Sequence, residues 1–173
     1  MKNIVLIGFM GTGKTSTGKL LASRMGYSFI DTDYKIEQVN KMTIKEMFAR
    51  YGENYFRQKE HEIIKKIADY RQVVISTGGG VVLNAENMKA LRKTSRIISL
   101  QASVDVIFER TSRRNNRPLL EQQNPKAIIA KLLEERLPLY QQADLQLDTS
   151  EFSPMQIVEK IMDWLKREGE IHA

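Results

Sequence analysis

Gly8-Phe-Met-Gly-Thr-Gly-Lys-Thr15 follows the apolar run Asn3–Ile7 and precedes a helical pattern. The segment satisfies G-x-x-x-x-G-K-[ST], and a strand before it with a helix after it is the context that this motif requires. Gly11 and Gly13 allow successive backbone N–H groups to converge on phosphate oxygens, and the following helix adds the positive end of its dipole. The sequence therefore predicts a phosphate-binding loop. The alternative is a glycine-rich turn with an incidental lysine.

The residue types in this loop predict how it would handle a nucleotide. Lys14 is expected to reach the β- and γ-phosphates, and the Thr15 hydroxyl is expected to coordinate Mg²⁺. ATP is favoured over GTP because the chain has no Asn-Lys-x-Asp guanine-recognition segment; Asn40-Lys41 continues with Met42-Thr43. The residues expected to contact the nucleotide here are Gly11, Thr12, Gly13, Lys14, Thr15 and Ser16.

Short apolar runs alternate with amphipathic stretches on both sides of the loop, which predicts an α/β fold with a parallel sheet. The predicted strands are Asn3–Ile7, Ser28–Ile30, Val73–Ser76, Arg96–Leu100 and Leu145–Leu147. Helix starts are marked by a capping box at Thr43-Ile-Lys-Glu46 and by a cap residue before proline at Asn124-Pro125 and Ser153-Pro154. A chain of 173 residues without a linker or repeat is expected to form one domain spanning residues 1–173.

Two segments depart from the alternation. Residues 34–68 contain several helical stretches in succession, more than one crossover needs, and are expected to form a substrate-binding subdomain beside the sheet. Residues 111–124 are rich in Arg, Asn and Gln and contain one proline, which is typical of a polar loop. We expect this second segment to be a lid.

The composition of the chain indicates which classes of ligand and partner to expect. The net charge of +6 favours anionic ligands, but it is too scattered to indicate nucleic acid. A small basic cluster (Arg110, Arg113, Arg114 and Arg117) lacks interleaved aromatic residues and is explained equally well by ATP phosphates. The chain has no cysteine, and its two histidines are far apart, so a Cys or His metal site is not expected. The apolar run at residues 4–7 is too short for a membrane span, and we expect a cytoplasmic protein.

Asp31-Thr-Asp33 follows the second predicted strand. Ligands of α/β folds bind at the carboxyl ends of strands, and residues two apart on an extended chain point to the same side. Both carboxylates are therefore expected to face the γ-phosphate, one serving Mg²⁺ and the other a substrate hydroxyl. The alternative is that Asp31 or Asp33 caps a helix beginning near Tyr34.

Three further features suggest a binding site for an acid. Gly78-Gly79-Gly80 follows the third predicted strand, where exposed N–H groups can approach a ligand. Arg57 and Arg136 are candidates for bidentate capture of a carboxylate. The glycines could instead form only a flexible turn, and each arginine could be paired with a neighbour, Arg57 with Glu60 and Arg136 with Glu134 or Glu135.

Taken together, these segments resemble the shikimate kinase family over nearly the whole chain. The matching segments are Gly8–Thr15, Asp31–Asp33, Gly52–Glu60, Ser76–Gly80, Arg117–Leu120 and Arg136–Tyr140. The resemblance implies a five-stranded parallel sheet in the order 2-3-1-4-5. It also implies transfer of the γ-phosphoryl of ATP to the 3-hydroxyl of shikimate, giving shikimate 3-phosphate and ADP in aromatic amino-acid biosynthesis.

The same resemblance implies roles for individual residues. It assigns Asp33 to catalysis and the ring hydroxyls, Arg57 and Arg136 to the shikimate carboxylate, and Gly78, Gly79 and Gly80 to the substrate. Asp31 joins Thr15 at Mg²⁺. Arg117 is implied to close over ATP and stabilise charge on the transferring phosphoryl, while Arg110 and the segment near Ser153 lie by the adenine. We expect a monomer whose partners are shikimate and ATP, with neither nucleic acid nor membrane.

Three other functions compete with this interpretation. A gluconate kinase would share the phosphate-binding loop and the lid, but Asp31-Thr-Asp33, Arg57 and the three glycines argue against it. A nucleoside monophosphate kinase would need a second base pocket, which the sequence does not reveal. A catalytically silent nucleotide-binding module would have no need of Asp33 beside Lys14 and Arg117.

Overall fold

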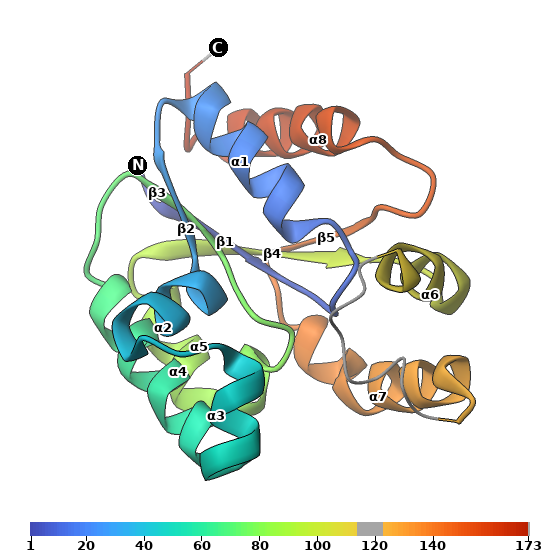
Figure 1. Ribbon diagram of the computed structural model, residues 1–173. Helices are drawn as coiled ribbons and strands as arrows, with labels where there is room; N and C mark the ends of the chain where they lie inside the picture. Colours follow the sequence, from blue (N-terminus) through green and yellow to red (C-terminus); the bar gives the residue numbers. More distant parts are fainter. Residues whose placement is uncertain (114–122, 173) are drawn as a thin grey trace.

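The computed structural model describes residues 1–113 and 123–172 as a sheet covered by helices on both faces (Figure 1). The strands are β1 (Asn3–Ile7), β2 (Ser28–Asp31), β3 (Val73–Ser76), β4 (Ser95–Gln101) and β5 (Leu145–Asp148). The helices are α1 (Lys14–Met25), α2 (Thr32–Asn40), α3 (Ile44–Tyr51), α4 (Glu53–Ile67), α5 (Ala85–Arg92), α6 (Val104–Ser112), α7 (Pro125–Tyr140) and α8 (Pro154–Arg167), with a short 3₁₀ turn, η1, at Val81–Leu83.

The sheet is parallel throughout, and its strand order is β2-β3-β1-β4-β5. This confirms the order implied by the resemblance and the five strands expected from the sequence. Three of the predicted strands were too short by one residue at one or both ends. β1 lies in the middle of the sheet, so the loop that leaves its carboxyl end reaches the centre of one edge.

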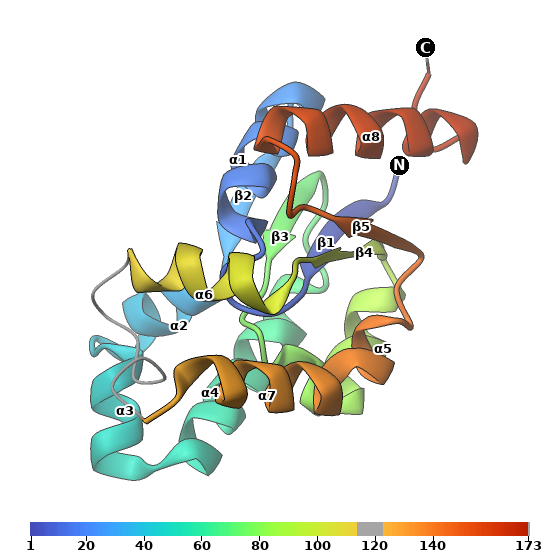
Figure 2. The ribbon, with the colours of Figure 1, turned by 90° about the vertical axis from the view of Figure 1, so that its right-hand side faces the viewer.

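Alternation along β1 explains the two apolar layers. Ile4 and Leu6 pack on one face with α1 and α8, whereas Val5 and Ile7 pack on the other with residues of α4, α5 and α7. Side chains of a strand point to opposite faces in turn, and all four are buried because parallel sheets are covered on both sides. Figure 2, turned by 90°, shows α8 and α7 on opposite sides of the sheet.

The predicted helix starts are confirmed. Thr43 and Glu46 form a reciprocal capping box at α3, and Asn124 caps α7 ahead of Pro125. Ser153 accepts a hydrogen bond from Gln156 N, and Gln156 Oε1 accepts one from Ser153 N, which closes a capping box at α8. Each cap satisfies backbone donors that the first turn of a helix leaves unpaired.

Of the two segments that were expected to depart from the β–α alternation, the structure describes the first in full and the second only in part. Residues 34–68 hold most of α2 and all of α3 and α4, which lie together on one side of the sheet (Figure 1). In the predicted lid, residues 111–112 end α6 and Asn124 caps α7, while 114–122, including Arg117, lie outside the described residues. Within the described chain, no helix is both long and apolar enough to cross a membrane.

Candidate functional site

The loop between β1 and α1 has the geometry that its sequence predicts. Gly11 and Gly13 have φ angles of 77° and 94°, in the left-handed region that favours glycine. Gly13 is the N-cap of α1 and gives that helix no side-chain cap. The first N–H groups of α1 are therefore available to an anion, at the positive end of the helix dipole.

Lys14 points into this loop. Its side chain is 8% exposed, and its ammonium group donates hydrogen bonds of 2.8 Å to the carbonyl oxygens of Gly8 and Phe9. Thr12 is fully buried, and its hydroxyl donates to the Phe9 carbonyl at 2.8 Å. These bonds fix the loop around a positive charge, as a site for phosphate requires.

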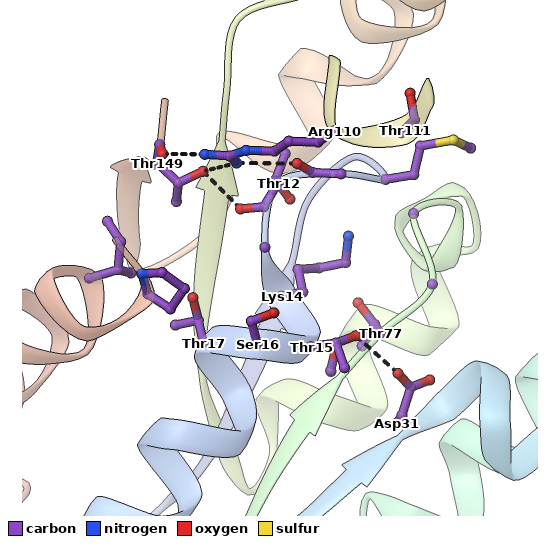
Figure 3. Close-up of a pocket in the computed structure, with 18 of the residues that line it drawn as sticks. Thr12, Lys14, Thr15, Ser16, Thr17, Asp31, Thr77, Arg110, Thr111 and Thr149 are labelled. Carbon is purple, nitrogen blue, oxygen red and sulfur yellow. Dashed lines mark hydrogen bonds between the residues drawn. The ribbon is translucent and has the colours of Figure 1, made fainter. Parts of the chain in front are cut away.

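A cavity of about 610 Å³ opens beside the loop. Its wall includes Gly11, Gly13, Thr15 and the exposed Ser16 from the phosphate-binding segment. Figure 3 shows Lys14, Thr77 and Asp31 around this space. Residues from the carboxyl ends of β1, β2, β3 and β5 all line it, as expected for a ligand site in a parallel α/β sheet.

Thr15 and Asp31 are neighbours at one side of the cavity. The Thr15 hydroxyl donates a 3.1 Å hydrogen bond to Asp31 Oδ2 (Figure 3). This pairing places two oxygen atoms suited to Mg²⁺ beside the predicted phosphate position. Among the described residues no cluster of three or more acidic, His or Cys side chains could hold a metal. The hydroxyl of Thr15 and the carboxylate of Asp31 are oxygen donors of the kind that Mg²⁺ takes when nucleotide phosphates and water supply most of its ligands.

The expectation that Asp31 and Asp33 lie on one extended strand is wrong. α2 begins at Thr32, so Asp31 is its N-cap and Asp33 lies in its first turn. Asp31 Oδ1 accepts a 3.2 Å bond from Tyr34 N, while its other oxygen contacts Thr15. Asp31 thus caps α2, as the alternative interpretation expected, and its second oxygen contacts the phosphate loop.

Asp33 reaches the glycine turn from α2. A methyl group on Gly78 would lie 2.6 Å from Asp33 Oδ1 and 3.3 Å from Glu60 Oε2, so both carboxyl groups lie against this residue. Gly78 N donates to Thr32 Oγ1 at 3.2 Å, which fixes the turn against the start of α2. Asp33 and Gly78 both line the cavity, beside the phosphate-binding loop.

The glycine turn lies between the two predicted carboxylate-binding arginines. A methyl group on Gly80 would overlap the Arg57 guanidinium, so glycine lets this side chain lie directly against the turn. A methyl group on Gly79 would lie 3.5 Å from Arg136 Nη1 and 3.4 Å from Met10 N in the phosphate loop. The turn therefore brings together Arg57 from α4, Arg136 from α7 and the loop after β1.

Arg57 is held in place by carboxylates of its own helix. Its Nη1 donates to Glu60 Oε1 at 2.9 Å, its Nε lies 3.4 Å from Glu53 Oε1, and its guanidinium lies over the Phe56 ring. Glu60 is 1% exposed, and burial raises the pKa of its carboxyl group, while Arg57 acts in the opposite direction. The other Glu60 oxygen, Oε2, has no hydrogen-bond partner among the described residues.

Arg136 has different surroundings. Its guanidinium lies 5.7 Å from the centre of the Phe9 ring, and in residues 1–113 and 123–172 no carboxylate is within ion-pair distance of it. The suggested pairing with Glu134 or Glu135 is thus not seen there. Arg136 is not itself in the cavity wall, but it lies against Gly79, which is. A guanidinium there with no carboxylate partner in this part of the chain is suited to an anionic ligand.

Arg110 and Thr149 join the opposite wall of the cavity. Arg110 Nη1 donates to Gly11 O at 3.2 Å and to Thr149 Oγ1 at 3.1 Å, and Nη2 donates to Thr149 O at 2.7 Å. Thr149 is 3% exposed, and its hydroxyl contacts the carbonyl oxygens of Thr12 and Gln101 at 2.8 and 3.1 Å. Figure 3 shows these bonds linking the phosphate loop to the segment after β5.

Ser153 lies next to this wall but faces its own helix. Its side chain is engaged in the capping box of α8, and the neighbouring Phe152 and Pro154 line the cavity instead. Arg117, the remaining predicted contact of the nucleotide, lies outside the described residues.

Sequence reasoning missed three residues of the site. Thr149 is a single threonine after a short strand, Tyr140 lies at the end of a long helix, and Glu60 entered only as a possible neighbour of Arg57. Their importance comes from tertiary contacts that no local pattern encodes. Only the position of Thr149, at the carboxyl end of β5, could have suggested a role.

Comparison with known proteins gives one consistent family. A family model described as "Shikimate kinase" matches residues 10–166. A shikimate kinase of Thermodesulfovibrio yellowstonii is 52% identical over 167 residues, which cover 96% of each chain. A structure described as shikimate kinase from Acinetobacter baumannii in complex with shikimate has a TM-score of 0.93 at 33% identity, covering 97% of this chain and 94% of that one. A gluconokinase from Sinorhizobium meliloti has a TM-score of 0.61 at 21% identity over 98% of this chain and 94% of its own, which shows a shared fold alone.

Proposed function

The chain belongs to the shikimate kinase family, and we propose how its residues divide the work of that reaction. The protein is an ATP-dependent phosphotransferase acting on a hydroxyl group. It transfers the γ-phosphoryl of ATP to the 3-hydroxyl of shikimate and yields shikimate 3-phosphate and ADP.

The position of the glycine turn is the main support for the proposed site. The glycine turn Gly78–Gly80 lies against the phosphate loop on one side and against Arg57 and Arg136 on the other. An acid bound between the two guanidinium groups would therefore have its ring next to the γ-phosphate of a nucleotide in the loop. Such positioning converts a bimolecular step into an effectively unimolecular one, which supplies much of the catalysis in phosphoryl transfer.

Thr15 and Asp31 are proposed to hold Mg²⁺ together with oxygens of the nucleotide. Bound there, the ion would neutralise charge on the phosphates and withdraw electrons from the transferring group. The existing 3.1 Å contact between the two side chains supports this assignment, because it holds the two oxygen atoms next to each other at the cavity wall. Lys14, held by the loop carbonyls, is proposed to add a second positive charge at the β- and γ-phosphates.

Asp33 is proposed to orient the attacking hydroxyl and accept its proton. In the reaction the bond between the γ-phosphorus and the β,γ-bridging oxygen breaks, and a bond from the acceptor oxygen to phosphorus forms. The proton leaves the acceptor oxygen as that bond forms. Asp33 is the carboxylate in the cavity wall that also adjoins the glycine turn. This position, between the phosphate loop and the proposed acceptor site, supports the assignment.

The remaining roles follow the resemblance. Gly11, Thr12, Gly13 and Ser16 are proposed to bind phosphate, with Arg110 and the segment near Ser153 beside the adenine. The role of Arg117 in stabilising the transferring phosphoryl, and that of a lid over residues 111–124, stay predictions. We also propose a single domain, with α2–α4 as the substrate-binding part, acting as a cytoplasmic monomer without nucleic-acid or membrane partners.

Lys14→Ala and Asp33→Ala test this division of labour. Loss of Lys14 should weaken both nucleotide binding and turnover, because it removes charge from the phosphates. Loss of Asp33 should leave ATP affinity within about twofold while reducing kcat by about 10² or more, the scale of general-base and positioning effects. The measurements are nucleotide titration by calorimetry and steady-state kinetics. Turnover at the level of the unsubstituted protein in Asp33→Ala would refute its catalytic role.

A further inference from the structure

Tyr140 connects the helix that carries Arg136 to the glycine turn. The residue ends α7 and is 2% exposed, and its hydroxyl donates a 2.5 Å hydrogen bond to the carbonyl oxygen of Gly79. Arg136 lies four residues earlier, on the same face of α7. The Tyr140 hydroxyl and Arg136 Nη1 therefore approach the same residue, Gly79, from one helix.

The hydrogen bond also sets the direction of a peptide group. Gly79 C=O and Gly80 N–H belong to one planar trans peptide unit, so they point in opposite directions. Holding the carbonyl toward Tyr140 turns the Gly80 N–H away from α7. In the part of the chain that the structure describes, this N–H donates to no protein group, unlike Gly78 N, which donates to Thr32.

A break in the hydrogen bonds of α7 makes the Tyr140 contact more important for the position of the helix end. Pro138 lies between Arg136 and Tyr140 and has no N–H, so α7 lacks the hydrogen bond that would join residues 134 and 138. The last turn of the helix is thus joined less firmly to the turn that carries Arg136. A tertiary bond from Tyr140 compensates by attaching the end of α7 directly to the substrate turn.

The phenol can act as this donor throughout the neutral range. Burial raises the pKa of Tyr140 above its usual value, and the nearby Arg136 and Arg57 guanidinium groups act in the opposite direction. Because the shift is upward, the hydroxyl keeps its proton at neutral pH.

We propose that Tyr140 is a positioning residue for the acceptor: its hydroxyl fixes the Gly79–Gly80 peptide, so that the Gly80 N–H and the Arg136 guanidinium present one pre-formed site to an acidic ring substrate. This inference rests on the proposed function of Arg57, Arg136 and the turn. Removing the hydroxyl leaves a partly buried carbonyl without its donor and lets the peptide rotate, which loosens the acceptor site but not the nucleotide loop.

Tyr140→Phe is the direct test, with Tyr27→Phe as its matched control. The Tyr27 hydroxyl is also buried, has no hydrogen-bond partner among the described residues, and belongs to the apolar layer on the other face of the sheet. We expect Tyr140→Phe to raise the KM for shikimate about tenfold, the scale of one intramolecular hydrogen bond, with the KM for ATP within twofold of its original value. Tyr27→Phe should change neither. An unchanged KM for shikimate, or an equal rise in both KM values, would overturn the proposal.

NMR spectroscopy can monitor the Gly79–Gly80 peptide group directly. Of the ten glycines, only Gly79 and Gly80 follow another glycine, so protein labelled with [1-¹³C,¹⁵N]glycine gives two amide signals in an HNCO spectrum. The Gly80 signal carries the carbonyl frequency of Gly79, the acceptor of the Tyr140 bond. We expect that frequency to change in Tyr140→Phe and to remain unchanged in Tyr27→Phe.

A third experiment adds shikimate to the unsubstituted protein and follows the Gly80 amide signal, so it does not depend on a stable variant. Adding shikimate should move the Gly80 amide signal, and a signal that stays in place at saturation would overturn the proposal. Arg136→Ala separates this failure from failure of the proposed function. If Arg136→Ala raises the KM for shikimate and Tyr140→Phe does not, only the Tyr140 inference fails; if neither does, the proposed acceptor site is wrong.

Discussion

Arg57 and Arg136 carry the same charge but differ in their partners. Arg57 is held by Glu60 and Glu53, whereas Arg136 lies over Phe9 with no carboxylate in reach among the described residues. Charge-assisted pairing with a bound acid would be an added contact for Arg57, which already has two partners. Arg136 has no ion pair with a described residue, so a bound acid would be its first carboxylate partner there.

Each arginine changed to alanine should therefore raise the KM for shikimate, by about 10- to 100-fold, because a hydrogen bond to a charged group contributes about 1.5–3 kcal/mol. Arg57→Ala should also lower the stability of the fold, since it leaves the buried Glu60 carboxylate without its partner. Initial-rate kinetics and thermal unfolding measure the two effects. The amide of shikimate should bind the unsubstituted protein weakly and lose little more in the variants. If the amide is phosphorylated as well as the acid, the carboxylate pocket is wrong.

At this scale the sequence predicted the phosphate loop well and the acidic segment less well. Gly13, Lys14 and Thr15 follow a motif whose spacing is fixed by the phosphates it binds. Asp33 was expected on an extended backbone just after the second predicted strand, whereas α2 begins at Thr32, because Asp31 and Asp33 can each either cap a helix or continue the chain beyond a strand. The start of α2 is fixed by Asp31 accepting Tyr34 N, a bond that the sequence allows but does not require.

The Thr149 hydroxyl joins the elements around the proposed nucleotide site. Thr149 Oγ1 contacts Thr12 O in the phosphate loop and Gln101 O at the end of β4, and it accepts from Arg110 of α6. Changing Thr149 to valine keeps the shape of the side chain and removes all three bonds.

Thr149→Val should raise the KM for ATP about fivefold or more, with the KM for shikimate nearly unchanged, because the bonds lost are all on the nucleotide side of the cavity. It should also destabilise the fold by about 1–3 kcal/mol, the cost of leaving buried polar groups unpaired. Kinetics with each substrate varied in turn, together with urea unfolding, provide the measurements. Thr149→Ser, which keeps the hydroxyl, should restore the affinity for ATP; a serine variant as impaired as the valine variant would contradict this role.

The elements themselves could be predicted from the sequence, but their order in the sheet could not. Alternating apolar runs and caps located every strand and several helix starts. Spacing in the chain does not say which strand lies beside which, because a right-handed crossover can skip a neighbour. The order β2-β3-β1-β4-β5 came only from the family resemblance, and the contacts of Thr149 and Tyr140 depend on that order.

Across the whole molecule, an ion pair joins the end of the chain to the sheet. Glu170, beyond α8, accepts a 2.7 Å bond from Arg96 of β4, and both side chains are partly buried. Burial acts to raise the pKa of Glu170, but Arg96 and Lys2 outweigh it, and the net shift is downward. A carboxyl group whose pKa is lowered by folding stabilises the fold above its unfolded pKa, about 4.3, and loses this effect as the pH falls further.

Glu170→Gln should therefore lower the free energy of unfolding by about 1 kcal/mol at pH 7. The difference from the unsubstituted protein should shrink steadily below about pH 4. Urea unfolding across this range is the measurement. Glu168→Gln, at an exposed position close by, should have little effect at any pH. A deficit in Glu170→Gln that is the same at pH 7 and at low pH would exclude the ion pair as its cause.

The most direct test of the account is acceptor choice. The family, the cavity and the two arginines together predict a kinase that requires an acidic ring acceptor beside its phosphate loop. ADP release by the purified protein should be measured with ATP and Mg²⁺, in the presence of shikimate, quinate, gluconate or AMP, each added separately. We expect stimulation by shikimate alone. Equal or greater stimulation by quinate, gluconate or AMP, or none by shikimate, would contradict the assignment of shikimate as the acceptor.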